Sequence, residues 1–258
     1  MEDEMIDFMD AIKDAAKKYG FDLEYRTKKA FKNLNENIIV ETNVCFVTDN
    51  DTVEIDVIAK IPYQYHFLVE CKGTHSDSIL LLVRDHNSRT FNQQGSILSS
   101  SDRLLQFTPD KDQDFFTFTG DFFNKRGGEL KPSSKNDNDN NLYKAQVQII
   151  DAIQAYLHYK SDDAFIEDTS SSGQREIIPL IVTNADIWVI NYGEEPESVK
   201  QYKWVLHNVR VNSKLNLDDS RENFLILIIS IKYLQELITN GLTKNSEHWS
   251  VYIKSGMF

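Results

Sequence analysis

Residues 53–73 decide the fold and read Val53-Glu-Ile-Asp-Val-Ile-Ala-Lys-Ile-Pro-Tyr-Gln-Tyr-His-Phe-Leu-Val-Glu-Cys-Lys-Gly73. Two runs rich in β-branched and aromatic residues, Val53–Ala59 and Tyr65–Cys71, flank a short segment that contains Pro62. Runs of this kind, separated by a turn signal, are typical of two consecutive antiparallel strands. The stretch therefore predicts a β-hairpin, and the rest of the chain is interpreted around it.

Both predicted strands carry charges where a buried strand is usually apolar. Regular alternation gives the first strand one face with Glu54, Asp56 and Ile58 and an opposite face with Val53, Ile55, Val57 and Ala59. On the second strand, Glu70 and Lys72 share a face with His66 and Leu68. If Asp56 lies beside Glu70, two carboxylates and one ammonium group meet at the end of an apolar ribbon. Burying them is unfavourable unless they pair with each other or bind a cation.

A divalent metal site would explain these charges. Mg²⁺ takes oxygen ligands, usually one or two carboxylates with water and substrate phosphate. Asp56 and Glu70 supply such a pair, and the backbone carbonyl of Cys71 could add a third oxygen. Lys72 could orient the attacking water or stabilise charge on the phosphate. An ordinary hairpin, whose charges face solvent or pair with each other, is the alternative interpretation.

Asp56 followed by Glu70-x-Lys72 resembles the Asp…(Asp/Glu)-x-Lys signature of the PD-(D/E)XK nuclease superfamily, and the surrounding residues are similar to its Mrr-like branch. The resemblance implies a restriction-endonuclease-like α/β fold, in which helices flank a central mixed β-sheet. It implies an endonuclease that hydrolyses DNA with Mg²⁺ or Mn²⁺, held by Asp56, Glu70 and the Cys71 carbonyl. Such nucleases commonly belong to restriction or anti-phage defence systems.

Three further residues are weaker site candidates. Family members often carry a catalytic-site glutamate on the helix before the first strand, where it reaches the metal or its water shell, and Glu24 is at the matching place. A surface carboxylate favoured by the helix dipole explains Glu24 equally well. Gln148, on the strong helical pattern of residues 142–159, resembles an auxiliary residue of some branches, although its spacing differs from their Gln-x-x-x-Tyr form. Glu41 lies on the less apolar face of the strand predicted over residues 38–47.

The chain is interpreted as a single domain, residues 1–258, with an insertion of about residues 73–141 after the third strand. Periodicity predicts further helices over 3–19, 21–34 and 232–238, and further strands over 79–83, 204–211, 224–229 and 248–253. A single buried helix is the alternative for residues 224–238. Residues 175–183 and 186–192 are predicted to form a second hairpin around Asn184-Ala185. The minimal family pattern has no insertion after the third strand. The inserted segment of this chain is expected to cover the site, contact substrate or bind a partner.

The chain carries 40 acidic and 28 basic residues, a net charge of −12. This balance argues against a large DNA-binding surface made by the chain alone. Arg26, Lys28, Lys29 and Lys32 form the best candidate basic patch, or simply a solvated helix face. DNA could instead be held by an ATPase or helicase partner, or by a homodimer. A non-catalytic subunit with the same fold, binding a protein partner, is the alternative function.

Several other classes lack support in the sequence. There is no glycine-rich phosphate loop, no Gly-x-Ser-x-Gly elbow and no zinc-type spacing among the six histidines and two cysteines. No apolar run approaches the roughly twenty residues of a membrane span, and the acidic N-terminus does not resemble a signal peptide. The sequence therefore predicts a cytoplasmic protein with no membrane partner.

Overall fold

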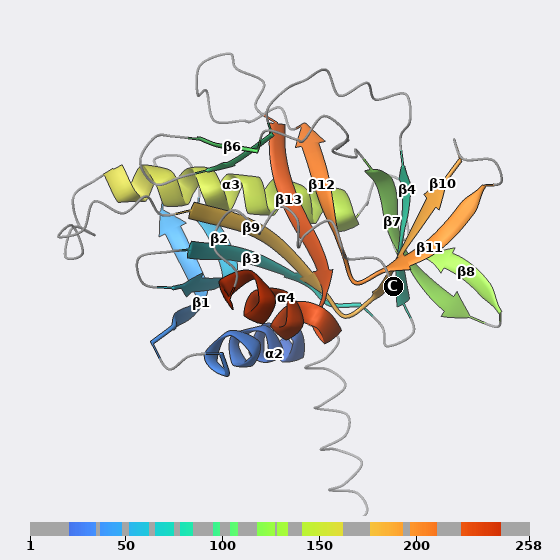
Figure 1. The fold of residues 1–258 in the computed structure, drawn as a ribbon, viewed down its shortest axis with the longest axis horizontal. Coiled ribbons are helices and arrows are strands. Elements are labelled where there is room, and N and C mark those ends of the chain that lie inside the picture. The colour runs from blue at the N-terminus through green and yellow to red at the C-terminus, as the bar shows by residue number, and fades with distance from the viewer. Residues whose placement is uncertain are drawn as a thin grey trace, which may run out of the picture.

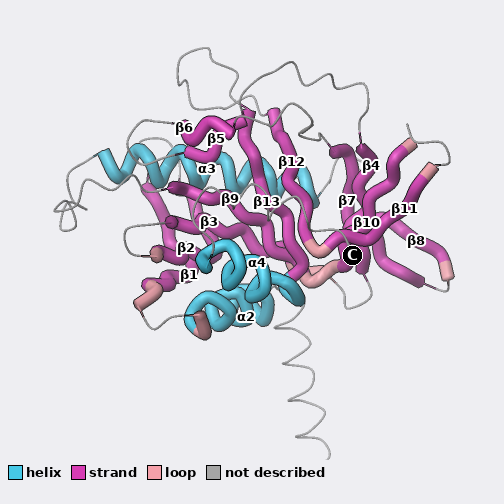
Figure 2. Tube along the Cα trace, viewed as in Figure 1, coloured by secondary structure: helices cyan, strands magenta, loops and turns pink. Residues whose placement is uncertain are grey.

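A computed structural model of the chain describes residues 21–34, 37–47, 52–61, 65–74, 78–84, 95–98, 104–107, 118–126, 128–133, 141–161, 176–192, 197–210 and 223–243. The helix predicted over 3–19 and the strand predicted over 248–253 lie outside these residues. In the described part the chain is a mixed α/β protein with two mixed sheets and three helices (Figures 1 and 2).

The larger sheet begins with the predicted meander. Strands β1 (Ile39–Val47), β2 (Thr52–Lys60) and β3 (Tyr65–Lys72) pair antiparallel in sequence order. β9 (Glu176–Thr183) then pairs parallel to β3, and β13 (Asn223–Ser230) pairs parallel to β9. β12 (Trp204–Arg210) pairs antiparallel to β13. β5 (Gly95–Leu98) also pairs with β13, in parallel, and β6 (Leu104–Phe107) pairs antiparallel to β5. β9 is therefore an internal strand, as its apolar sequence predicts.

Helices cover both faces of this sheet (Figure 1). α2 (Phe21–Lys32) and α4 (Ile231–Thr243) pack on one face, and α3 (Asn141–Ser161) packs on the other. α2 buries Leu23, Thr27 and Phe31, whose spacing of four residues forms a single stripe along the helix. Two buried apolar cores result, which we call the α3 core and the α2/α4 core after the helices that close them.

A second, five-stranded sheet has the order β11 (Ser198–Tyr202), β10 (Asp186–Asn191), β4 (Ser78–Arg84), β7 (Phe118–Arg126) and β8 (Glu129–Pro132). It lies at the right of Figure 1, and three of its strands come from the predicted insertion. Leu80, Leu82 and Phe122 extend from it into the α3 core. The Phe118 amide also donates to His207 Nδ1 on β12 at 3.2 Å. The two sheets are thus joined by shared packing.

The predicted hairpin of residues 175–183 with 186–192 is wrong. β9 pairs with β3 and β13, whereas β10 pairs with β4 and β11 in the other sheet. The turn signal at Asn184-Ala185 marks the point where the chain leaves one sheet for the other. Asn184 accepts bonds from the Thr74 amide and hydroxyl, each 2.8 Å, and donates to the Thr74 carbonyl at 2.7 Å. Asn184 therefore binds the connection after β9 to the one after β3.

No helix in the described ranges is both long and apolar enough to cross a membrane.

Replacing Gly120 by alanine is expected to destabilise the second sheet. Gly120 pairs with Leu82 between β7 and β4, and an added Cβ would overlap the backbone carbonyl oxygen of Leu81. Because that oxygen belongs to a paired strand, relief requires a shift of the backbone. We expect a loss of about 1–3 kcal/mol in the free energy of unfolding, measured by urea denaturation. The exposed neighbour Thr119→Ala is the control, and equal stability of both variants would contradict the prediction.

Candidate functional site

The site lies where β2 and β3 separate. The two strands pair from Lys60 with His66 as far as Val57 with Val69. Beyond that point the Cys71 amide donates to Asp56 Oδ2 at 2.6 Å. A side-chain carboxylate therefore takes the place of a backbone acceptor and lies in the fork between the strands.

Glu70 and Lys72 lie on one face of β3, as alternation predicts. Lys72 Nζ is 2.9 Å from Glu70 Oε1 and donates to Gln148 Oε1 on α3 at 2.7 Å. Glu70 is only 3% exposed. Leu68, two residues before Glu70, belongs to the α3 core, so this face of β3 is directed toward α3. The structure thus brings Glu70, Lys72 and Gln148 together from two elements.

Burial and crowding of acidic groups control the protonation of the carboxylates. Burial, reinforced by the charge of Asp56, raises the pKa of Glu70 to about 7, although Lys72 opposes the rise. Burial also raises the pKa of Asp56, against the lowering effects of the Cys71 amide and of Lys72. For both carboxylates, the effect of burial on the pKa outweighs the favourable contacts with Lys72 and, for Asp56, with the Cys71 amide.

Glu24 approaches the same place from the other side of the sheet. It lies in the first turn of α2. Burial first, and then the charges of Asp56 and Glu54, raise the pKa of Glu24. Glu24 also contributes to the raised pKa of Glu70. The charge of Glu24 thus interacts with the charges of Asp56 and Glu70, the two predicted metal ligands.

The backbone of Cys71, rather than its thiol, faces the fork. The thiol donates to Thr27 Oγ1 on α2 at 3.6 Å. The N–H and C=O groups of one strand residue point toward the same edge of the strand. Because the Cys71 N–H reaches Asp56, the Cys71 carbonyl is directed toward that edge as well. The predicted use of this carbonyl as an oxygen ligand is compatible with the strand geometry.

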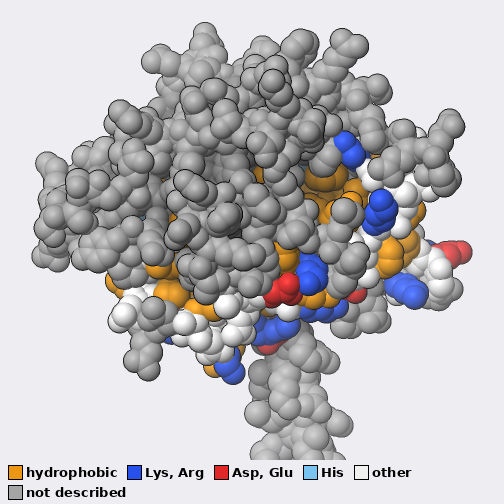
Figure 3. Space-filling view, in the orientation of Figure 1, with side chains coloured by type: hydrophobic (Ala, Val, Ile, Leu, Met, Phe, Trp, Pro, Cys, Tyr) orange, Lys and Arg blue, Asp and Glu red, His pale blue; other side chains and the backbone are white. Residues whose placement is uncertain are grey.

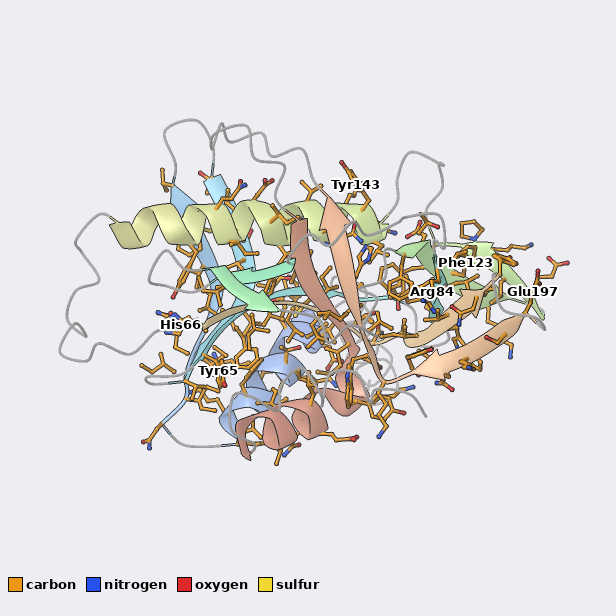
Figure 4. The ribbon with its side chains drawn as sticks, turned by 45° about the horizontal axis from the view of Figure 1, so that its top comes forward. Tyr65, His66, Arg84, Phe123, Tyr143 and Glu197 are labelled. Atoms are coloured by element: carbon orange, nitrogen blue, oxygen red, sulfur yellow. The ribbon has the colours of Figure 1, made fainter. Side chains whose placement is uncertain are left out.

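Other polar candidates have structural partners elsewhere. Glu41 forms an ion pair with Lys60 at 2.6 Å. His66 is buried, and its Nδ1 is 2.6 Å from the Tyr156 hydroxyl. Figure 4 shows His66 beside Tyr65, the first residue of β3, so it lies at the opposite end of that strand from Lys72. These two residues are not brought into the site.

Thr183 is a residue near the site that the sequence reasoning missed. It is fully buried at the end of β9, directly opposite Lys72 in the parallel register. Its hydroxyl donates to the Lys72 carbonyl at 3.0 Å and accepts from the Ala185 amide at 3.1 Å. A threonine ending an apolar strand carries no distinctive signal, because only the pairing of β3 with β9 identifies its partner.

The donor set fits a hard divalent cation. Within the described residues, no group of three or more His, Cys, Asp or Glu side chains could hold a metal ion. A site with two carboxylates and a carbonyl does not need such a group, because Mg²⁺ usually keeps several waters. Asp56, Glu70 and the Cys71 carbonyl are all oxygen donors. A divalent cation would also stabilise the ionised form of Glu70, whose pKa is raised first by burial and then by the charge of Asp56.

The two cysteines are expected to differ sharply toward a thiol reagent. Burial raises the pKa of the Cys71 thiol well above its usual value, and Cys45 is exposed. Since the thiolate is the reactive form, native protein should release one equivalent of chromophore from an aromatic disulfide reagent, and the second only after unfolding. The variant Cys45→Val should remove the fast reaction. Rapid modification of both thiols in native protein would contradict the assignment.

Models of known protein families, curated proteins and solved structures contain no match to this chain.

Proposed function

We propose that the chain is a metal-dependent nuclease that hydrolyses phosphodiester bonds of DNA. One observation carries the proposal: the fork between β2 and β3 gathers Asp56, Glu70 and Lys72, and Gln148 holds the lysine from α3. A buried carboxylate (Glu70) and a partly buried one (Asp56) beside one ammonium group match the needs of metal-assisted phosphoryl transfer. The three residues are those of the Asp…Glu-x-Lys motif.

The order of the elements supports the same proposal. α2, the antiparallel strands β1 to β3, α3 and the parallel strand β9 follow one another in an arrangement similar to the restriction-endonuclease-like core. The strands β4 to β8 come between β3 and α3, which is where the sequence predicts an insertion. We infer that this is a nuclease core with an added sheet.

Each residue has a role in this proposal. Asp56, Glu70 and the Cys71 carbonyl would hold Mg²⁺ or Mn²⁺, and Glu24 would contact the water molecules bound to that ion. The metal would supply Lewis acidity and a more acidic bound water. Lys72 orients the attacking water and stabilises negative charge on the phosphate, while Gln148 keeps the ammonium group in place. Water bonds to phosphorus as the bond to the 3′ oxygen breaks; the water loses a proton and the 3′ oxygen gains one, which gives a 5′-phosphate and a 3′-hydroxyl.

The test is cleavage of duplex DNA, single-stranded DNA and RNA with Mg²⁺, with Mn²⁺ and with EDTA. The proposal expects metal-dependent cleavage of DNA by the native chain and loss of it in Glu70→Ala. Full activity of Glu70→Ala would remove the proposal. Repeating the assay with an added ATPase or helicase, and at several protein concentrations, tests whether a partner or a homodimer holds the DNA.

A non-catalytic subunit is the second candidate, and surface charge favours it. The chain has a net charge of −12, and Arg26 of the predicted basic patch lies 3.6 Å from Asp22. On the face shown in Figure 3, some of the described Lys and Arg side chains lie beside Asp or Glu side chains. Titration calorimetry separates the two candidates, because a scaffold would show no Mn²⁺ binding that depends on Asp56 and Glu70. If the chain is a nuclease, we propose that it acts in the cytoplasm in restriction or anti-phage defence.

A further inference from the structure

The faces of β2 reverse within the strand, close to Asp56. Val57 and Ala59 belong to the α2/α4 core, and regular alternation would place Ile55 there too. Ile55 instead belongs to the α3 core, where the partly buried Val53 also packs. The alternation predicted for this strand is therefore wrong on the N-terminal side of Asp56.

The neighbouring strand β1 reverses at the same level. Val40 belongs to the α2/α4 core, whereas Val44 packs on the α3 core and Phe46 belongs to it. The residue between the two halves, Asn43, has a φ of 52° and is the non-glycine residue with positive φ in the described part of the chain. Asn43 therefore marks the reversal on β1.

The two reversals face each other across the ladder. The pairing of β1 with β2 runs through Thr42 with Val57 and resumes at Val44 with Ile55 in the same register. Asn43 and Asp56 are the residues left between these pairs. Neither strand has an inserted residue, so the face reversal is not a β-bulge. Both backbones instead rotate locally, and each strand exchanges its two faces.

The reversal and the Asp56 contact coincide. Pairing of β2 with β3 ends at Val57 and Val69, and the next residue of β2, Asp56, accepts the Cys71 amide with its side chain. A regular strand would continue the backbone ladder at this point. The strands therefore reverse their faces at Asn43 and Asp56, which is also where the Cys71 amide donates to the Asp56 carboxylate instead of to a backbone carbonyl.

We propose that Asn43 is a positioning residue, whose left-handed backbone conformation keeps the Asp56 carboxylate in the fork between β2 and β3. Asparagine and glycine adopt positive φ readily, whereas a β-branched residue strongly disfavours it. The role in metal binding rests on the proposed nuclease function. The role in holding Asp56 against Cys71 does not depend on that function.

The test uses Cys45→Val as the parent protein, because it leaves Cys71 as the single cysteine. Selective ¹⁵N-cysteine labelling then gives one amide signal, which reports the bond to Asp56. This parent is also a matched control, because it places a valine on β1 two residues from Asn43. Its Mn²⁺ affinity should equal that of the native chain. Asn43→Val and Asn43→Gly are made in this parent.

Asn43→Val is expected to shift the Cys71 amide signal upfield, to speed its hydrogen exchange and to weaken Mn²⁺ binding at least tenfold by calorimetry. Asn43→Gly should keep the parent's signal and an affinity within about twofold, because glycine accepts the same φ. If Asn43→Val does not fold, Asn43→Ala takes its place, with the same expected direction and a smaller shift.

Two results would overturn the inference: an unchanged Cys71 signal in the valine or alanine variant, or an equal loss in the glycine variant. The second result would mean that the asparagine side chain acts, and not its backbone conformation. Absence of Mn²⁺ binding and of cleavage in the native chain would instead end the nuclease proposal. The Cys71 amide signal would still decide whether Asn43 holds Asp56.

Discussion

Glu70→Gln is expected to lower metal-dependent DNA cleavage by a factor of about 10²–10³ or more, the scale of losing one strong charge-stabilising group in an active site. The substitution keeps the shape of a side chain that is 3% exposed but removes the negative charge that would hold the cation. Lys72→Ala should cause a loss of similar size, because its ammonium group lies 2.9 Å from Glu70. Single-turnover cleavage at saturating Mg²⁺ measures both effects.

The matched controls come from the ion pair on the neighbouring strands. Glu41 and Lys60 form a 2.6 Å ion pair outside the site, so Glu41→Gln and Lys60→Ala change the same charges without touching the fork. Both controls should keep nearly the native rate. A control that lost as much activity as the Glu70 or Lys72 variant would show that charge in this sheet matters in general, and the assignment of the site would fall.

The stability of the metal-free protein should depend on pH through Glu70. Its pKa rises from an ordinary value of 4.5 to about 7 on folding. A carboxyl group with a raised pKa favours the folded state below pH 4.5, and this contribution is lost as the pH rises to about 7. The shift corresponds to a maximum of about 3 kcal/mol. In EDTA, native protein should lose stability relative to Glu70→Gln between pH 4.5 and 7.

Magnesium should reverse this difference. A cation that binds the ionised site of the folded state stabilises it by mass action and favours loss of the Glu70 proton. At pH 8, Mg²⁺ should therefore raise the melting temperature of the native chain and leave Glu70→Gln nearly unchanged. Thermal unfolding of both proteins, with Mg²⁺ and with EDTA, tests this. Parallel pH profiles and an equal response to Mg²⁺ would show that Glu70 is neither the titrating group nor a ligand.

Local patterns were sufficient for the elements that carry the site. The meander of β1 to β3 and the helix α3 follow from apolar periodicity and turn signals. For β13 and α4 the same pattern allows either a strand running into a helix, which the structure has, or a single helix. Alternation along a single strand also places Glu70 and Lys72 on one face. This prediction needs no knowledge of distant residues, which is why it agrees with the observed 2.9 Å contact.

Other features depend on partners that a local pattern does not reveal. β9 and β10 look like a hairpin because they are adjacent in sequence, but β3 and β4 are better partners across more than a hundred residues. Alternation also fails at Asn43, because a positive φ inside a strand reverses its faces without any change in register. The role of Thr183 likewise emerges only from its position opposite Lys72.

The hydrogen bonds between Asn184 and Thr74 also place the site where two connections between the sheets meet. The links that follow β3 and β9 both pass from the larger sheet to the smaller one, and three hydrogen bonds fasten them together. Lys72 and Thr183 are the last residues before these links. Two of the crossings between the sheets therefore meet next to Lys72, so a displacement of the smaller sheet has a short path along the backbone to the residue whose ammonium group lies in the site.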